Sequence, residues 1–156
     1  MTVQAIVDRH GNQREHLLAI LHDMQAATPD HSLHRQDIRE LANIMSIPLS
    51  DIVGTASFYT MFSFKPRGRH IIRICESPPC YIMGEENIRR AIETKLGIRM
   101  GETTPDGRFT LEYSSCLGAC GVAPVMMIDD QVYGNLTEKK VLEILESMAQ
   151  DAPVFL

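Results

Sequence analysis

The chain has 156 residues, of which 44% are hydrophobic and 22% are charged, a composition that is typical of a globular protein and excludes a disordered or collagen-like chain. Its formal net charge of -5 argues against a nucleic-acid-binding protein, because such proteins neutralise phosphates with basic side chains. Its apolar stretches fall far short of the roughly 20 residues that a membrane-spanning helix needs, so we expect no insertion into a membrane.

The first part of the chain carries the periodicity of helices. Apolar residues recur at i, i+3, i+4 and i+7 over residues 14–27, and the same spacing returns in a second segment that ends before Pro48. A third and shorter helix is predicted over residues 51–62. Its inner face would be formed by Ile52, Val53, Ala56 and Tyr59. This part of the chain is therefore predicted to be a small helical bundle.

Residues 65–70 read Lys-Pro-Arg-Gly-Arg-His and combine a helix breaker, a flexible residue and positive charge, as linkers do. We therefore divide the chain into a helical bundle domain, residues 1–68, and a second domain, residues 69–156. In chain order the second domain is predicted to contain a strand over 71–74, a helix over 85–96, a strand over 109–114, a hairpin over 125–133 and a last helix capped by Thr137. The predicted fold class is α+β.

The four cysteines of the chain form two close pairs. Cys75 and Cys80 are separated by four residues, Cys116 and Cys120 by three, and each pair begins where a predicted strand ends. No export signal is evident, which predicts a reducing, cytoplasmic compartment where close-spaced thiols more often bind metal than form disulfides. Four thiols can hold a tetrahedral zinc ion or a 2Fe-2S cluster, or can form two disulfides. The Cys-x-x-Cys site of a dithiol oxidoreductase is absent from the sequence.

The loop between the second pair favours a cluster over a single ion. Residues 116–121 read Cys-Leu-Gly-Ala-Cys-Gly and offer small side chains with consecutive backbone N–H groups. Such amides can donate to sulfur and offset the negative charge of a cluster. The glycines alone are also compatible with an ordinary tight turn.

These motifs resemble those of the thioredoxin-like 2Fe-2S ferredoxin family. The resemblance rests on Cys75-x4-Cys80 followed by Cys-Leu-Gly-Ala-Cys-Gly-Val-Ala-Pro at residues 116–124. It extends to residues 47–68 of the first domain and to Val-Tyr-Gly-Asn-Leu-Thr at residues 132–137. The family resemblance implies a helical bundle joined to a thioredoxin-like domain, with one cluster held by the four cysteines.

The resemblance also implies partners. Family members serve NADH:quinone oxidoreductases, NAD-linked formate dehydrogenases and NAD(P)-reducing or bifurcating hydrogenases, so this chain would dock against a larger iron-sulfur subunit that binds FMN and NAD(P). Further subunits would complete the complex, which is either cytoplasmic or attached to a membrane. The sequence holds no G-x-G-x-x-G loop and no P-loop, and we predict no catalytic residue in it. Two alternatives stay open, namely a zinc-stabilised interaction module without redox activity and a free-standing ferredoxin.

The first cysteine loop departs from the family pattern. Glu76, Pro78 and Pro79 stand where many members carry small residues. Prolines donate no N–H, and a carboxylate adds negative charge beside an anionic cluster, so both changes are predicted to lower the reduction potential.

Overall fold

The structure is a computed structural model that describes residues 2–149. The chain divides into two compact units, the first ending at Arg69 and the second beginning at His70. Within the described residues, no helix is long and apolar enough to cross a membrane.

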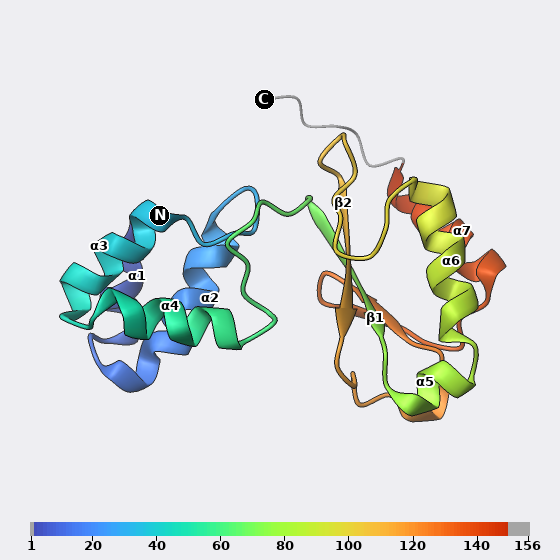
Figure 1. Cartoon of the computed structure of the whole chain (residues 1–156), viewed down its shortest axis with the longest axis horizontal. Helices are drawn as coiled ribbons and strands as arrows, with labels where there is room; N and C mark the ends of the chain where they lie inside the picture. The colour runs from blue at the N-terminus through green and yellow to red at the C-terminus, as the bar shows by residue number, and fades with distance from the viewer. Residues whose placement is uncertain (1, 150–156) are drawn as a thin grey trace. The chain divides into compact units, whose positions relative to one another are not determined.

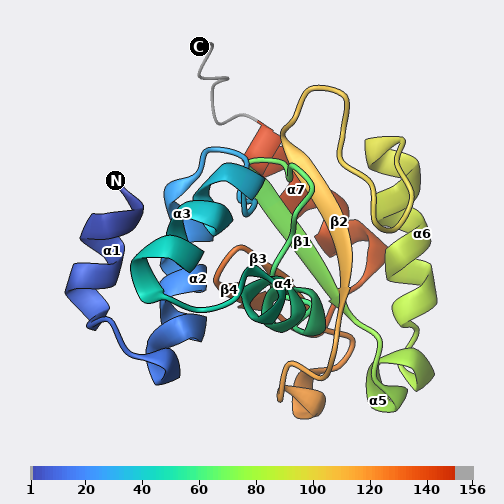
Figure 2. The ribbon, with the colours of Figure 1, turned by 60° about the vertical axis from the view of Figure 1, so that its left-hand side comes forward.

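The first unit is helical (Figures 1 and 2). It consists of α1 (Val3–His10), the 3₁₀ helix η1 (Arg14–His16), α2 (Leu17–Ala27), α3 (Arg35–Met45) and α4 (Leu49–Phe58). These helices enclose a core to which each α-helix contributes buried side chains, among them Ile6, Ile20, Leu41 and Ile52. The apolar stripe of each helix therefore faces the others, as the periodicity of the sequence predicts for α2 and α3.

Helix α1 was not predicted from the sequence, although its end signals are present. The Thr2 hydroxyl accepts a hydrogen bond from the Ala5 amide at 3.4 Å, and Gly11 ends the helix with a φ of +85°. Only Val3, Ile6 and Val7 are buried on its inner face. This apolar stripe is too short to show a clear helical periodicity, and valine, which is β-branched, has a lowered helix propensity.

The predicted inner face of α4 is half wrong. Ile52 and Ala56 are buried, whereas Val53 and Tyr59 are 39% and 40% exposed. Tyr59 lies beyond the last helical residue, Phe58, and Val53 follows Ile52 by about 100° of helical rotation. Val53 therefore projects beside the core instead of into it.

The predicted linker is ordered where it leaves the first unit. The Arg67 amide donates to the Asp30 carbonyl at 2.8 Å, and the Arg67 guanidinium donates to the Met61 carbonyl at 3.0 Å. Arg67 is only 7% exposed. This arginine therefore belongs to the packing of the first unit and is not a freely solvated charge.

The second unit combines a sheet with helices (Figure 1). Its elements are β1 (His70–Cys75), α5 (Pro78–Ile82), α6 (Glu85–Leu96), β2 (Phe109–Ser114), the 3₁₀ helix η2 (Cys120–Val122), β3 (Met126–Ile128), β4 (Gln131–Tyr133) and α7 (Glu138–Ala149). The strands, the hairpin and the two long helices that the sequence predicts are all present. The predicted Thr137 cap is also confirmed, since its hydroxyl accepts a hydrogen bond from the Lys140 amide at 3.2 Å.

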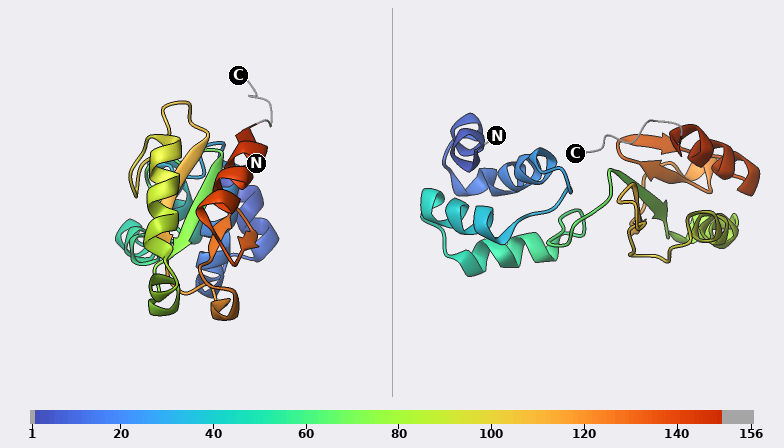
Figure 3. Two further views of the ribbon diagram at one scale, coloured as in Figure 1. Left: turned by 90° about the vertical axis from the view of Figure 1, so that its right-hand side faces the viewer. Right: turned by 90° about the horizontal axis from the view of Figure 1, so that it is seen from above.

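The four strands form one mixed sheet in the order β2-β1-β3-β4. β1 is parallel to β2 and antiparallel to β3, and β3 and β4 form the hairpin (Figure 2). α6 and α7 lie side by side against one face (Figures 1 and 3), where Ile92 and Leu145 pack on Ile72 and Leu111. The α+β prediction is confirmed, and the unit has the thioredoxin-like arrangement that the family resemblance implies.

Candidate metal centre

The two cysteine loops start from the same edge of the sheet. Because β1 and β2 are parallel neighbours, their carboxyl ends lie together, and Cys75 stands opposite Ser114 in the register. The Glu76 amide extends this ladder to the Ser114 carbonyl at 3.1 Å, and the Cys75 amide donates to the Val125 carbonyl at 3.2 Å. Three chain segments therefore meet at this edge.

The first cysteine pair is buried. Cys75 is the last residue of β1 and 2% exposed, and Cys80 lies inside α5 and is 1% exposed. Both pack in a small apolar cluster with Ala123 and Val125. α5 begins with Pro78 and Pro79, positions where a helix makes no use of the N–H that proline lacks. This helix was not predicted from the sequence, because the two prolines were considered only for the N–H groups that they lack.

The second cysteine pair lies at the surface. Cys116 and Cys120 are both exposed, and their Sγ atoms are 3.7 Å apart. The Gly118 amide donates to Cys116 Sγ at 3.4 Å. Gly118 has a φ of +76°, a left-handed conformation that favours glycine, so the backbone itself aims this N–H at the sulfur.

Polar groups of both loops lower the pKa of one thiol in each pair. Burial acts to raise the pKa of the Cys75 thiol, but donation from the Ser77 and Leu117 amides and from the Cys80 thiol and Ser77 hydroxyl outweighs it and lowers this pKa. The pKa of Cys116 is also lowered, by the Gly118 amide first, then by Cys120 and by the Ser77 hydroxyl. Ser77 therefore lowers the pKa of one thiol in each pair.

The other member of each pair has the opposite character. Burial raises the pKa of Cys80 to about 11, with a further contribution from the Cys75 thiol. The hydrogen bond to Cys116 and the charge of that sulfur raise the pKa of Cys120. Each pair thus holds one thiol that ionises readily and one that ionises late in the metal-free chain.

The four thiols are arranged as two pairs. A tetrahedral zinc ion with Zn–S bonds of about 2.3 Å needs all four sulfurs within about 3.8 Å of one another. The Cys116–Cys120 separation of 3.7 Å matches one edge of such a tetrahedron. Two adjacent thiol pairs are the donor set that a 2Fe-2S cluster uses.

Several carboxylates also lie near the first cysteine loop. Burial raises the pKa of Glu85, which is 5% exposed, and among the charges around it Arg89 lowers this pKa while Glu86, Glu76 and Glu93 raise it. One oxygen of Glu85 is buried without a hydrogen-bond partner. Glu76 is therefore one of several residues with carboxylate side chains at this end of the sheet.

The structure brings all four predicted cysteines to one edge of the sheet, and their assignment as ligands stays a prediction. Sequence reasoning anticipated amide donation in the second loop. Ser77, the N-cap residue of α5, was not predicted to act on the site, although its amide and hydroxyl lower the pKa of Cys75. A serine directly before proline is a helix-start signal and could have revealed this role.

The chain is similar to known proteins. A family profile described as "Thioredoxin-like [2Fe-2S] ferredoxin" matches residues 3–149. The chain is 42% identical over 129 residues to a subunit of the NADH-quinone oxidoreductase of Escherichia coli (strain K12), spanning 83% of this chain and 75% of that protein. It is 35% identical over 130 residues to the NADP-reducing hydrogenase subunit HndA of Solidesulfovibrio fructosivorans, again with coverage of 83% and 75%.

A solved structure supports the fold. The NAD+-reducing [NiFe]-hydrogenase in the air-oxidized state superposes with a TM-score of 0.77 at 25% identity over 88% of this chain, which corresponds to 23% of the longer hydrogenase chain. The family implies a 2Fe-2S cluster, and the four thiols fit that group. The match over nearly the whole described chain confirms the resemblance predicted from the cysteine motif, and the protein belongs to the thioredoxin-like 2Fe-2S ferredoxin family.

Proposed function

We propose that this chain is the electron-transfer subunit of a multi-subunit NAD(P)-dependent oxidoreductase and that it holds one 2Fe-2S cluster. Cys75 and Cys80 would bind one iron, and Cys116 and Cys120 the other. The observation that carries this proposal is the meeting of two thiol pairs at the carboxyl ends of the parallel strands β1 and β2. Relatives named as subunits of NADH-quinone oxidoreductases and of an NADP-reducing hydrogenase support it.

A bound cluster supplies a site that takes up and releases one electron at a time. The residues of this chain would set its surroundings. The Gly118 amide donates to Cys116 Sγ, and the Ser77 and Leu117 amides lower the pKa of Cys75, so all three favour a negatively charged sulfur. Ala123 and Val125 keep water from the first pair, whereas the second pair stays open to a partner.

The partner we propose is a larger iron-sulfur subunit that binds FMN and NAD(P). A nicotinamide delivers electrons in pairs, and a flavin passes them on singly, so a one-electron site beside the flavin is needed. This chain has no G-x-G-x-x-G loop or P-loop for the nucleotide. The complex would be of the NADH-quinone oxidoreductase or NAD(P)-reducing hydrogenase type. The free thiols fit a reducing compartment such as the cytoplasm.

The test is iron and zinc analysis with electron paramagnetic resonance on anaerobically purified protein, before and after dithionite reduction. We expect two irons per chain and a signal that appears only on reduction, as a one-electron cluster requires. Stoichiometric zinc without a signal would instead make the chain a zinc-stabilised interaction module.

A second measurement separates a subunit from a free-standing ferredoxin. Gel filtration of the chain co-expressed with its flavoprotein should show one complex that contains both. If the iron-loaded chain elutes alone, it is an independent ferredoxin and the subunit assignment is wrong.

A further inference from the structure

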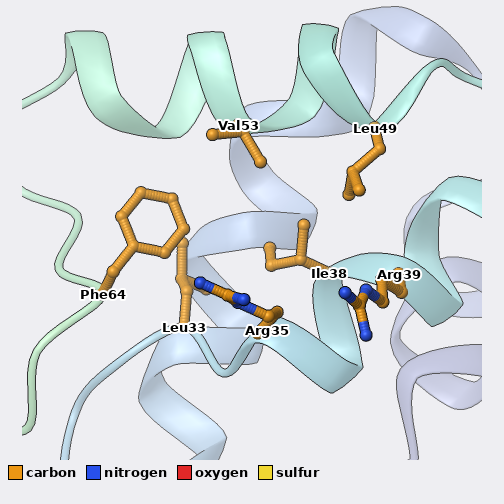
Figure 4. A pocket seen from close by; sticks show the side chains of 7 residues that line it. All are labelled: Leu33, Arg35, Ile38, Arg39, Leu49, Val53 and Phe64. Atoms are coloured by element: carbon orange, nitrogen blue, oxygen red, sulfur yellow. The ribbon is translucent and has the colours of Figure 1, made fainter.

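An apolar groove lies between α3 and α4 of the first unit, whereas all four cysteines belong to the second unit. Its volume is about 440 Å³, and Figure 4 shows side chains from both helices and from the segment after α4 pointing into it. It is lined by Leu33, Arg35, Ile38, Arg39, Leu49, Val53 and Phe64. The exposed Val53 that contradicts the sequence prediction is part of this groove.

The groove has a buried floor and exposed apolar walls. Leu33 and Ile38 belong to the core of the first unit. Leu49, Val53 and Phe64 are 41%, 39% and 44% exposed. Neighbouring apolar side chains of this size, left in water around a concavity, are typical of an interaction site.

Two arginines stand along one side of the groove. Arg35 and Arg39 are exposed, lie four residues apart on α3, and within residues 2–149 neither guanidinium forms an ion pair or a hydrogen bond. The carboxylates of α3 are on another side, because Asp37 and Glu40 line a separate cavity with Thr2 and residues of α1 and α2. α3 therefore presents only positive charge to the groove of an otherwise acidic protein.

We propose that this groove binds an amphipathic helical segment of another subunit, with two carboxylates one helical turn apart beside a row of apolar side chains. Arg35 and Arg39 are separated by about 6 Å along α3, and carboxylates at i and i+4 of a partner helix have the same separation. Each guanidinium can bind a carboxylate through two parallel hydrogen bonds. The apolar row would cover Leu49, Val53 and Phe64, as in other helix-in-groove complexes.

This charge pattern favours a peptide segment over other occupants. A small inorganic anion would satisfy the arginines and leave the three apolar walls in water. A purely apolar segment would cover the walls and leave two guanidiniums desolvated without a partner, which is costly. The inference rests on the proposed function in one respect, because it assigns the segment to a subunit of the same oxidoreductase.

The first experiment places a photo-crosslinking residue at the groove in the assembled oxidoreductase. The variant Val53→p-benzoylphenylalanine should crosslink to a segment of another subunit that contains paired Asp or Glu residues beside apolar ones. The matched control is Leu18→p-benzoylphenylalanine, since Leu18 is 40% exposed in the same unit but lies on α2 outside the groove. A crosslink to a second copy of this chain, to lipid or to no polypeptide would overturn the proposal.

The second experiment reverses the charge. The double variant Arg35→Glu/Arg39→Glu should bind the remaining subunits at least tenfold more weakly and lose the Val53 crosslink, whereas Arg35→Lys/Arg39→Lys should keep part of the affinity. Lys139→Glu on the exposed surface of α7 is the charge control and should bind as the unchanged chain does.

Two further measurements on the same samples are the iron content and the electron paramagnetic resonance signal after dithionite reduction. Together they distinguish a failure of the groove assignment from a failure of the electron-transfer proposal. Undiminished binding by an iron-loaded double variant would overturn the groove assignment and leave the electron-transfer proposal intact. Absence of iron in the unchanged chain would overturn the electron-transfer proposal whatever the crosslinks show.

Discussion

The first cysteine pair is buried, whereas the second lies at the surface, with Cys116 in a loop and Cys120 at the start of the 3₁₀ helix η2. Cys75 ends a strand and Cys80 lies in a short helix, so both positions are set by the packing of β1 and α5. Cys116 and Cys120 are positioned by a left-handed glycine and an amide that points at sulfur. The same residue type is therefore held by packing in one loop and by backbone conformation in the other.

The contrast indicates a division of tasks. A buried, well-packed pair resists rearrangement and keeps water away, because packed interiors transmit strain instead of absorbing it. An exposed pair can adjust and lets a partner approach closely. We therefore expect changes in the first loop to affect cluster retention, and changes in the second loop to be better tolerated.

Replacing a cysteine of each loop with serine should give the largest difference between the loops, measured as retained iron. Cys80→Ser is expected to lose the bound iron, because the buried Cys80 side chain is enclosed by Cys75, Ala123 and Val125 and has little room to readjust to the shorter bond to oxygen. Cys120→Ser should retain about tenfold more iron, since its exposed loop can readjust around the new ligand. Iron analysis and visible absorption after anaerobic purification measure this difference. If both variants retained equal amounts of iron, packing would not distinguish the two loops. Replacing either cysteine with alanine is the common control and should remove the cluster.

Thiol labelling of the metal-free chain should differ by a large factor between the pairs. A pKa of about 11 leaves only about one Cys80 thiol in a thousand ionised at pH 8, and the thiolate is the reactive form. Cys116 is exposed and its pKa is lowered, so iodoacetamide should modify it first. Mass spectrometry of timed samples gives the rates.

The pH dependence has a definite sign. Because the pKa of Cys80 is raised, its labelling should rise about tenfold per pH unit between pH 8 and pH 10, whereas Cys116 should approach its maximum at a lower pH. Labelling of Cys80 in denaturant is the control that removes both burial and the raised pKa. If Cys80 reacted as fast as Cys116 in the folded chain, the first loop would be open and not buried.

The positions of both cysteine pairs could be predicted because strand periodicity leads directly into Cys75 and Cys116. What the sequence could not give is the neighbour relation, since only the observed sheet order places β2 beside β1. The amide donors at Ser77 and Leu117 were equally hidden, because they depend on loop geometry that no periodic pattern encodes.

The errors share a physical cause. Pro78 and Pro79 were weighed only for their missing N–H groups, although proline at the first turn is compatible with a helix. Val53 was assigned to the core by spacing alone, and spacing cannot tell a core from a groove beside it. Local rules thus located the elements, while the surroundings of single side chains were set by tertiary packing.

The reduction potential should respond to the charge of the first loop. Glu76→Gln removes an exposed carboxylate near the site and is expected to raise the midpoint potential, because the reduced cluster carries one more negative charge. A surface charge pair contributes about 1 kcal/mol or less, and about 1.4 kcal/mol corresponds to about 59 mV for one electron, so the expected rise is at most about 40 mV. Glu143→Gln, an exposed change on α7, is the control in the same redox titration. Pro79→Ala should raise the potential further if the restored amide donates to sulfur. An unchanged potential in both variants would show that neither the Glu76 charge nor the missing proline amide lowers the reduction potential.

The smallest expected effect tests the backbone of the second loop. A methyl group at Gly118 or at Gly121 would meet no atom within 4 Å, but only Gly118 has a φ in the left-handed region, +76°. Gly118→Ala should therefore destabilise the iron-loaded protein by about 1 kcal/mol through backbone strain alone, which corresponds to a fall in Tm of about 2–4 °C. Gly121→Ala is the matched control and should leave Tm unchanged or slightly higher, because alanine restricts the unfolded chain more than glycine does. Equal Tm values for the two variants would mean that the second loop relaxes freely around its cysteines, and the backbone conformation at Gly118 would then no longer explain how Cys116 is held.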